Sequence, residues 1–471
     1  MEQTKNYKLN KPGQDDFYNV EDFNQNADIL DQALKELAEG GSDQYVSKTG
    51  DTMTGELDFQ INDCTLTVGE GGVSGRNNIH SMNKEKNTFR PLSIGCSELI
   101  FSNGSKITNL GTPTSDFDAA NKKYVDDNAG GKRTCRFVVG TSTAGWTKKD
   151  CDYLCDGTDD QVEIQAAINA LPYTGGEVVV LDGTYNITKK INIQNPGLKL
   201  IGCGKGTKLQ RMANSEGDLY GLIDIRNNDI QVSNFYIFGN NQNFKDGYNC
   251  GITIDKNYGG ILISDNYFEY HQNNMLYLKT GLVRSKIVNN IFDDTFGSGI
   301  FLGKNDLLSQ GVVISGNNFL YCRASGIDLN YCQGSSVFGN TFWRNGYGIR
   351  LGYNAKNNTI SGNSCFENNY HGISCDITQN VNFIEGNTIS GNTCFNNLVG
   401  INLKGCNKNT IVGNTCIRGT GLPSDYTSTQ HTIRLEETNN NYNLIANNNL
   451  MGKNYVSGGD ANNTFVNNKY N

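Results

Sequence analysis

A short phrase, Ile-x-x-Asn, recurs through the C-terminal half of the chain and constrains the fold more than any other feature. It occurs seven times, once with Val in place of Ile, and its asparagines are 22 to 29 residues apart. A period in the low twenties predicts the rungs of a parallel β-helix with two or three strands per turn. A leucine-rich repeat has a similar period, but its Leu-x-x-Leu-x-Leu signature is missing. The asparagines are Asn266, Asn290, Asn317, Asn340, Asn363, Asn392 and Asn414.

Stacking of the rungs assigns a face to each position around this phrase. Equivalent positions in successive rungs lie about 4.8 Å apart, so the asparagines should form a ladder in which each side-chain amide bonds the next rung. Side chains alternate along a strand, which places the second residue after each asparagine inside and the third outside. The expected inward row is Phe268, Phe292, Phe319, Phe342, Cys365 and Cys394. The expected outward row is Glu269, Asp293, Leu320, Trp343, Phe366 and Phe395.

A second strand, Gly-Ile-x-Leu or similar, follows most of the asparagines. Its outward row places Asp328 beside Arg350 in the next rung. Arg344 and Glu367 are each the fourth residue after a ladder asparagine, so they are also neighbours in successive rungs. We therefore expect two ion pairs between rungs, each contributing less than about 1 kcal/mol because both are exposed. The expected outward row is Thr253, Tyr277, Phe301, Asp328, Arg350, Ser374 and Asn402.

Composition and charge agree with short strands joined by polar turns. The chain has 55 Gly and 6 Pro, and its 10% aromatic content is too high for a disordered protein. A net charge of −8 argues against a broad footprint on nucleic acid. Neither a secretory signal nor an apolar run of 18 residues is present, so we expect synthesis in the cytoplasm and no membrane insertion. The 14 Cys include no Cys-x-x-Cys pair, which predicts buried thiols, no metal site and no cofactor.

The sequence divides into three regions. Residues 1–42 contain apolar residues at helical spacing between 29 and 37, and we expect them to form an anchor. Residues 43–132 are polar, rich in glycine and thin in apolar residues, as in a fibre shaft, with a short helix at 118–125. Residues 133–471 form the β-helix, which opens with a strand at 137–139. A helix at 161–171 follows, capped by Asp159 or Asp160, and should cover the open end of the solenoid.

Short phrases in the first two regions resemble phage tail-fibre repeats. They occupy residues 45–55 and 107–113, the latter running into 121–126, and residues 11–18 look like the opening of fibres from prophages of Gram-positive bacteria. The strand, Asp-rich cap, helix and strand of residues 137–181 resemble the start of pectate-lyase-like right-handed β-helices. These resemblances imply a homotrimeric fibre in a virion tail. Residues 1–42 would bind baseplate or tail proteins, and the β-helix would bind a host cell-surface polysaccharide or teichoic-acid-like glycan. A phage and a phage-tail-like bacteriocin are equally compatible with them.

Many β-helix fibres cut the glycan that they bind, so a catalytic site must be considered. Glu269 and Asp293 are equivalent in adjacent rungs, with Asp294 beside them, and stacking brings their carboxyl groups about 5 Å apart, the separation in retaining glycosidases. The Gly-His-Gly and Arg-Ile-Lys phrases of polygalacturonases, however, are absent. A receptor-binding fibre without enzymatic activity is therefore the main prediction, and a glycan depolymerase is the alternative. The residues expected to bind the glycan are Tyr277, Phe301, His271, Asp328 and Arg350.

The apolar part of the first outward row predicts an interface. Leu320, Trp343, Phe366 and Phe395 would form a ridge about 15 Å long. Contiguous exposed apolar patches usually mark an interaction surface. We expect a contact between subunits of the trimer in preference to a platform for sugar rings, because this row itself carries no hydrogen-bonding groups.

Overall fold

The computed structural model describes most of the chain in two units, residues 1–112 and 113–471, which are treated separately below. None of its described helices is long and apolar enough to span a membrane. The tail-fibre phrases at 45–55 and 107–109, part of the phrase at 11–18 and the expected boundaries near 42 and 132 lie outside the described residues. These are residues 2–15, 19–41, 57–70, 77–94, 110–115, 117–128, 135–214, 220–245, 247–303, 307–376, 384–418, 430–436, 440–451 and 462–470.

The first unit is thin. Helix α1, Val20–Gly41, covers the expected helical segment and begins earlier, and β1 (Glu2–Gln3) pairs with β2 (Asn10–Lys11) beside it. An antiparallel sheet follows, made of β3 (Leu57–Ile61), β4 (Cys64–Glu70) and β5 (Asn77–Asn83). Among the side chains described in this unit, no large apolar one is buried. The described part of this unit therefore buries little apolar surface, which leaves little to stabilise it as a single chain.

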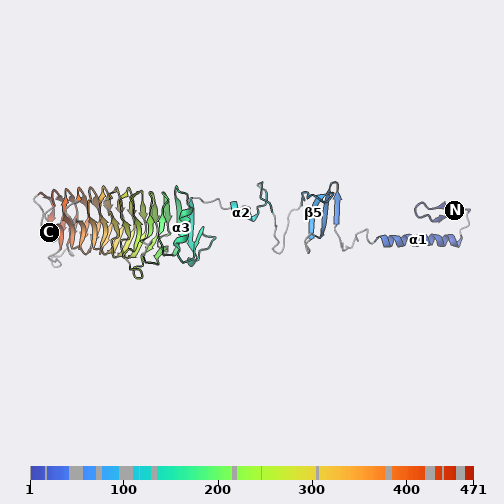
Figure 1. Cartoon of the computed structure of the whole chain (residues 1–471), viewed down its shortest axis with the longest axis horizontal. Coiled ribbons are helices and arrows are strands. Elements are labelled where there is room, and N and C mark those ends of the chain that lie inside the picture. The colour runs from blue at the N-terminus through green and yellow to red at the C-terminus, as the bar shows by residue number, and fades with distance from the viewer. Residues whose placement is uncertain are drawn as a thin grey trace. The chain divides into compact units, whose positions relative to one another are not determined.

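The second unit is a right-handed parallel β-helix, seen in Figure 1 as a stack of coils running from α3 to the C-terminus. In the sequence it is preceded by α2 (Lys122–Asn128), which overlaps the helix expected at 118–125. Three long parallel sheets form the walls of its described part, and from β8 onward neighbouring strands within them come from successive rungs.

The strands of these sheets are short and regular. The first sheet contains β7 (Tyr153–Cys155), β6 (Arg136–Thr141), β8 (Gly176–Val180), β11 (Leu198–Ile201), β14 (Gln231–Ser233), β18 (Leu262–Ser264), β22 (Lys286–Val288), β26 (Val313–Ser315), β30 (Ser336–Phe338), β33 (Thr359–Ser361), β37 (Thr388–Ser390), β41 (Thr410–Val412), β44 (Leu444–Ala446) and β46 (Thr464–Val466). The second sheet contains β9 (Gly183–Ile187), β12 (Thr207–Arg211), β15 (Tyr236–Phe238), β19 (Tyr267–His271), β23 (Ile291–Thr295), β27 (Asn318–Cys322), β31 (Thr341–Trp343), β34 (Ser364–Phe366), β38 (Thr393–Phe395), β42 (Thr415–Ile417), β45 (Asn449–Met451) and β47 (Lys469–Tyr470). The third sheet contains β10 (Ile191–Ile193), β13 (Gly221–Ile225), β16 (Cys250–Ile254), β20 (Leu276–Leu278), β24 (Ile300–Leu302), β28 (Ser325–Leu329), β32 (Tyr347–Leu351), β35 (His371–Asp376), β39 (Val399–Lys404) and β43 (His431–Glu436). Shorter pairings join β17 (Tyr258–Gly259), β21 (Leu282–Val283), β25 (Ser309–Gln310) and β29 (Cys332–Gln333), and join β36 (Ile384–Glu385) to β40 (Cys406–Asn407).

The predicted asparagine ladder is confirmed and lies buried between the first and second sheets. The side-chain amide of Asn340 donates to Asn363 Oδ1 at 3.0 Å and to the carbonyl of Ile314 at 2.9 Å, while its Oδ1 accepts from the backbone of Asn317. Each rung therefore satisfies the polar groups of its neighbour, which burial requires. Two further ladders were not predicted, and they run through Asn345, Asn368 and Asn397, and through Asn358, Asn387, Asn409, Asn443 and Asn463.

The predicted inward row is also confirmed. The rings of Phe292, Phe319 and Phe342 stack with centroids 4.7 and 4.8 Å apart and planes within 4°, and all are fully buried. Cys365 and Cys394 continue the row as buried thiols. The packing also explains the glycine of the Gly-Ile-x-Leu strands, which form the third sheet. A Cβ on Gly326 would lie 2.4 Å from the Phe342 ring.

Helix α3 (Gln161–Ala170) covers the N-terminal end of the solenoid as expected, with Ile164, Ala167 and Ile168 buried against it. The predicted cap residue is confirmed at Asp160, but the hydrogen bond expected of it is not. Asp160 occupies the cap position, but its carboxylate accepts from the backbone of Gly157 and Asn186 instead of from the helix. The hydrogen bond from Asn186, a residue of β9, connects the cap to the first rung.

Candidate functional site

The outer face of the third sheet carries a groove of about 450 Å³ in which aromatic side chains follow the rungs. Tyr277 pairs in register with Phe301, and their ring centroids are 5.5 Å apart. Tyr220 stacks on Tyr277 from the other side at 5.6 Å. The lining residues are Tyr220, Asn273, Asn274, Tyr277, Phe301, Gly303, Asn330, Tyr331, Arg350 and Tyr353. Aromatic faces with amides and a guanidinium between them suit the alternating apolar and hydroxyl-bearing surfaces of a sugar chain.

One ion pair organises the polar end of this groove. Arg350 Nη1 lies 3.1 Å from Asp328 Oδ2, so the predicted ion pair forms, although it is largely buried and not exposed as expected. Asn330 donates to the other carboxylate oxygen at 3.0 Å. Asp328 is almost fully buried, and burial raises the pKa of its carboxyl group while Arg350 opposes that rise. Asp328 therefore holds Arg350 in place, and Arg350 is the member of the pair that lines the groove.

The expectation that His271 contacts a glycan is wrong. Its side chain is 0% exposed and lies 3.2 Å from both the Asn249 side chain and the Ile237 carbonyl. Burial, with the charge of Arg211, lowers the pKa of His271 to about 3. The preceding residue, Tyr270, has φ of 55°, and this left-handed turn reverses the alternation and directs His271 into the core.

The outer face of the second sheet holds the predicted acid pair. Glu269 and Asp293 are in register, and the hydroxyl group of Tyr267 bridges them, 3.2 Å from Glu269 Oε1 and 2.9 Å from Asp293 Oδ2. Tyr236 also donates to Glu269. Burial raises the pKa of Asp293, the charges of Glu269 and Asp294 raise it further, and the Tyr267 hydrogen bond opposes the rise. Asp293 thus retains its proton more readily than an ordinary aspartate, and it lies beside the second acid of the pair.

The sequence analysis missed the two tyrosines of this cluster. Tyr236 and Tyr267 lie two positions before the outward residues Phe238 and Glu269, so period-two alternation already placed them on the same face. The amine of Lys205 lies 3.3 Å from the centroid of the Tyr267 ring, over its face. The outer surface here is therefore a connected set of acids, phenols and amines rather than two isolated carboxylates.

The ridge of Leu320, Trp343, Phe366 and Phe395 faces outward as predicted, and each member is partly exposed. Polar side chains from neighbouring positions also lie against this ridge. The indole of Trp343 donates to Glu367 at 3.1 Å, and Arg344 donates to the same oxygen at 2.8 Å, which confirms the second predicted ion pair.

Comparison with known proteins identifies the family. The sequence of residues 204–385 and 309–471, more than half of the chain, matches the family described as periplasmic copper-binding protein (NosD). The chain belongs to the NosD family. No curated protein matches it.

Solved structures that resemble this NosD-family chain share its fold at low identity. The A-module of the mannuronan C-5 epimerase AlgE4 from Azotobacter vinelandii is 15% identical, with a TM-score of 0.55, over 70% of this chain and 95% of that one. DFA-IIIase from Arthrobacter chlorophenolicus without its lid is 14% identical, with a TM-score of 0.52, over 72% and 99%. ORF18 of Geobacillus virus E2 is 17% identical, with a TM-score of 0.40, over 71% and 60%. The likeness to the first two structures shows the parallel β-helix fold.

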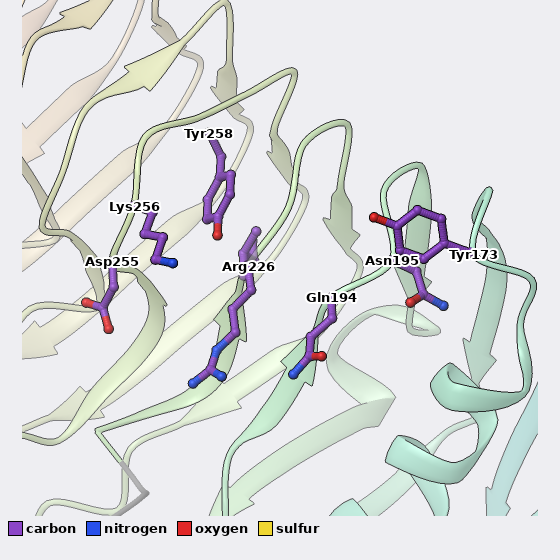
Figure 2. A pocket seen from close by; sticks show the side chains of 8 residues that line it. Tyr173, Gln194, Asn195, Arg226, Asp255, Lys256 and Tyr258 are labelled. Atoms are coloured by element: carbon purple, nitrogen blue, oxygen red, sulfur yellow. The ribbon is translucent and has the colours of Figure 1, made fainter.

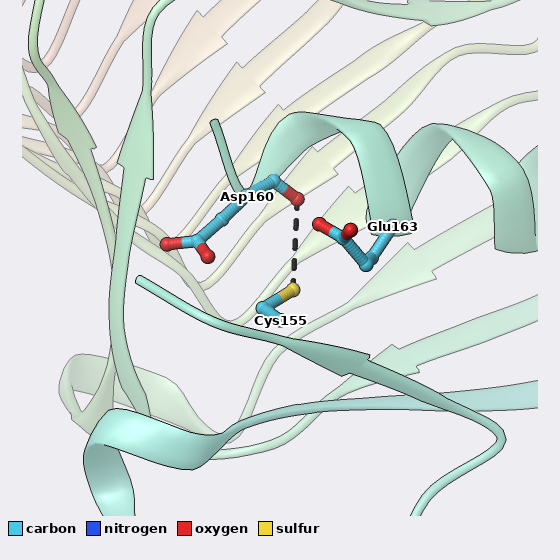
Figure 3. A group of neighbouring side chains, drawn as sticks. All are labelled: Cys155, Asp160 and Glu163. Atoms are coloured by element: carbon cyan, nitrogen blue, oxygen red, sulfur yellow. Dashed lines mark hydrogen bonds between the residues drawn. The ribbon is translucent and has the colours of Figure 1, made fainter. Parts of the chain in front are cut away.

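The residues that the structure describes do not fit the copper site that the family's name implies. Among the described residues, one group of three possible ligands lies within 4.8 Å, namely Cys155, Asp160 and Glu163, shown in Figure 3. It lies in the cap, before the matched residues, and the carboxylate of Asp160 is already occupied by two backbone amides. Burial raises the pKa of Asp160 and Glu163, which favours protonated groups over metal ligands.

Proposed function

We propose that this chain is a tail fibre of a phage or phage-tail-like particle and that it holds a host cell-surface glycan in the groove of the third sheet. The observation that carries the proposal is the row of Tyr220, Tyr277 and Phe301, ending on the fixed guanidinium of Arg350. The resemblance of residues 11–18, 45–55, 107–113 and 121–126 to fibre sequences supports the placement in a virion tail, with residues 1–42 binding baseplate or tail proteins.

The groove is tested by the adhesion of the full-length protein to cells and to their purified surface glycans. Phe301→Ala should weaken binding about tenfold or more, as truncation of an aromatic residue in a binding site usually does. Tyr277→Ala should act in the same direction. Phe338→Ala is the matched control, because Phe338 is 45% exposed on the first sheet, away from the groove. Equal binding by all three variants and the wild type would contradict the groove as the binding site.

Assembly as a homotrimer is part of the same proposal. The first unit buries no large apolar side chain among those described, and the ridge on the second sheet offers a line of apolar contact to a neighbouring subunit. Light scattering should give about three times the chain mass of 51.7 kDa. A mass equal to one chain at micromolar concentration would contradict the trimer.

The acid–tyrosine cluster favours a second candidate function, cleavage of a glycan. Asp293, whose pKa is raised, would give its proton to the leaving glycosidic oxygen while Glu269 attacks the anomeric carbon. Water would then hydrolyse the resulting glycosyl ester, with Asp293 taking the proton from that water. Incubation with host glycan should release oligosaccharides from the wild type, and neither Glu269→Gln nor Asp293→Asn should do so. Absence of any product from the wild type would exclude this function for that glycan.

A further inference from the structure

A second hollow, of about 690 Å³, lies near the N-terminal end of the third sheet (Figure 2). Its walls come from the turns that follow β10, β13 and β16. Figure 2 shows Lys256 and Asp255 at one end, Arg226 and Gln194 in the middle, and Asn195 with Tyr173 at the other end. The side chains that line it are therefore mostly polar, and we call it the cationic pocket for the reason that follows.

Positive charge predominates in and around this pocket. Its lining contains two cations, Arg226 and Lys256, and one exposed acid, Asp255. Below the pocket Asp224 is almost fully buried, and its carboxylate lies 2.8 Å from Arg226 Nε and 4.0 Å from Lys190 Nζ. Three cations thus surround two acids, which leaves one positive charge on a chain whose net charge is −8. Lys256 makes no ion pair among the residues that the structure describes.

The cationic pocket and the aromatic groove both lie along the third sheet. Asp224 pairs in register with Thr253, and Thr253 pairs with Tyr277 of the groove. Two rungs therefore separate Asp224, which binds Arg226, from Tyr277 of the groove, a distance of about 10 Å. A polymer that lies along the solenoid axis over the third sheet would meet the aromatic rings and the cations in turn.

We propose that the cationic pocket binds an acidic group, a carboxylate or a phosphate, of the same glycan whose rings occupy the groove. This inference rests on the proposed function and deepens it, because it names the ligand class as an acidic polysaccharide.

The test uses full-length protein and the cell-wall polysaccharide of a strain to which that protein adheres. One sample is kept native, a second has its carboxyl groups reduced to alcohols, and a third has its phosphates removed with hydrofluoric acid. Loss of about tenfold in affinity on one of the two treatments supports the inference and identifies the acid, since one charge-assisted hydrogen bond has about this value. Binding of the native sample should also weaken with added salt.

Variants separate this pocket from the groove. Lys256→Glu should lower affinity for the native polysaccharide about tenfold and leave the acid-free sample unaffected, and Lys256→Arg should retain the native affinity. Lys286→Glu, an exposed lysine of the first sheet, is the control for charge alone. Phe301→Ala should weaken all samples alike.

The outcomes distinguish the two proposals. If the acid-free samples bind as tightly as the native one, or if Lys256→Glu matches the wild type, the pocket does not recognise an acid and the inference is wrong, while the groove can still stand. If the protein adheres to no strain and no glycan, both the proposed function and this inference are wrong.

Discussion

The inside and the outside of the same strands follow different rules. In β19, β23 and β27 the second residue after the ladder asparagine is an inward phenylalanine, whereas the next, outward residue changes from Glu269 to Asp293 to Leu320. The interior repeats because each rung must satisfy the one above and below it with the same ring or amide. The exterior has no such constraint, so the residues that bind or cut a ligand are found where the repeat is broken.

The largest effect that separates the two faces is expected from Phe319→Ala. This ring is fully buried between Phe292 and Phe342, so its removal leaves a cavity and should lower the free energy of unfolding by about 3–5 kcal/mol. Denaturant titration measures the loss. Phe338→Ala is the control on the outer face and should cost less than about 1 kcal/mol, and similar losses in both variants would contradict the contrast.

The second largest effect is expected from lowering the pH, which should reduce the stability of the folded chain through a buried histidine. His271 is buried with a pKa lowered to about 3, and its ordinary value is 6.5. Between these values the unfolded chain binds a proton and the folded chain does not, so stability is present above pH 6.5 and is lost as the pH falls, by about 1.4 kcal/mol per unit. Unfolding measured from pH 7 to 5 should show this slope, and His271→Gln should reduce it. If His271→Gln has the same slope as the wild type, His271 is already protonated in the folded chain over this pH range. His371, whose pKa is lowered to about 4, contributes in the same direction.

Sequence reasoning predicted the regular parts of this structure and failed where the backbone turns. The period gave the fold, the Asn266–Asn414 ladder, the phenylalanine stack and the pairing of Asp328 with Arg350, because each depends only on equivalent positions in neighbouring rungs. His271 was misplaced because a left-handed residue at the corner reverses the alternation. The cationic pocket was missed because its residues come from turns after different strands, where no period applies.

The ridge tests the exterior as a surface for another subunit. Trp343→Ala should weaken trimer formation by about 2 kcal/mol while each β-helix remains folded, because its indole is partly exposed in the single chain. Sedimentation over a range of concentrations measures the change, and circular dichroism confirms the fold. Loss of adhesion with an intact trimer would instead show that the ridge contacts the glycan.

The smallest effect on stability is expected from the acid pair. Burial and the neighbouring charge of Glu269 raise the pKa of Asp293, so the folded chain holds that proton more tightly than the unfolded chain. Stability is then present at low pH and is lost as the pH rises through the folded pKa, so Asp293→Asn should be neutral or stabilise the protein by less than about 1 kcal/mol at pH 7. The asparagine carbonyl still accepts from Tyr267, which keeps the local hydrogen bond. Adhesion should be unchanged, because Asp293 lies on the second sheet and the groove on the third. A destabilisation as large as that of Phe319→Ala would show that this outward position carries an interior role, and the contrast between the two faces would fail at this rung.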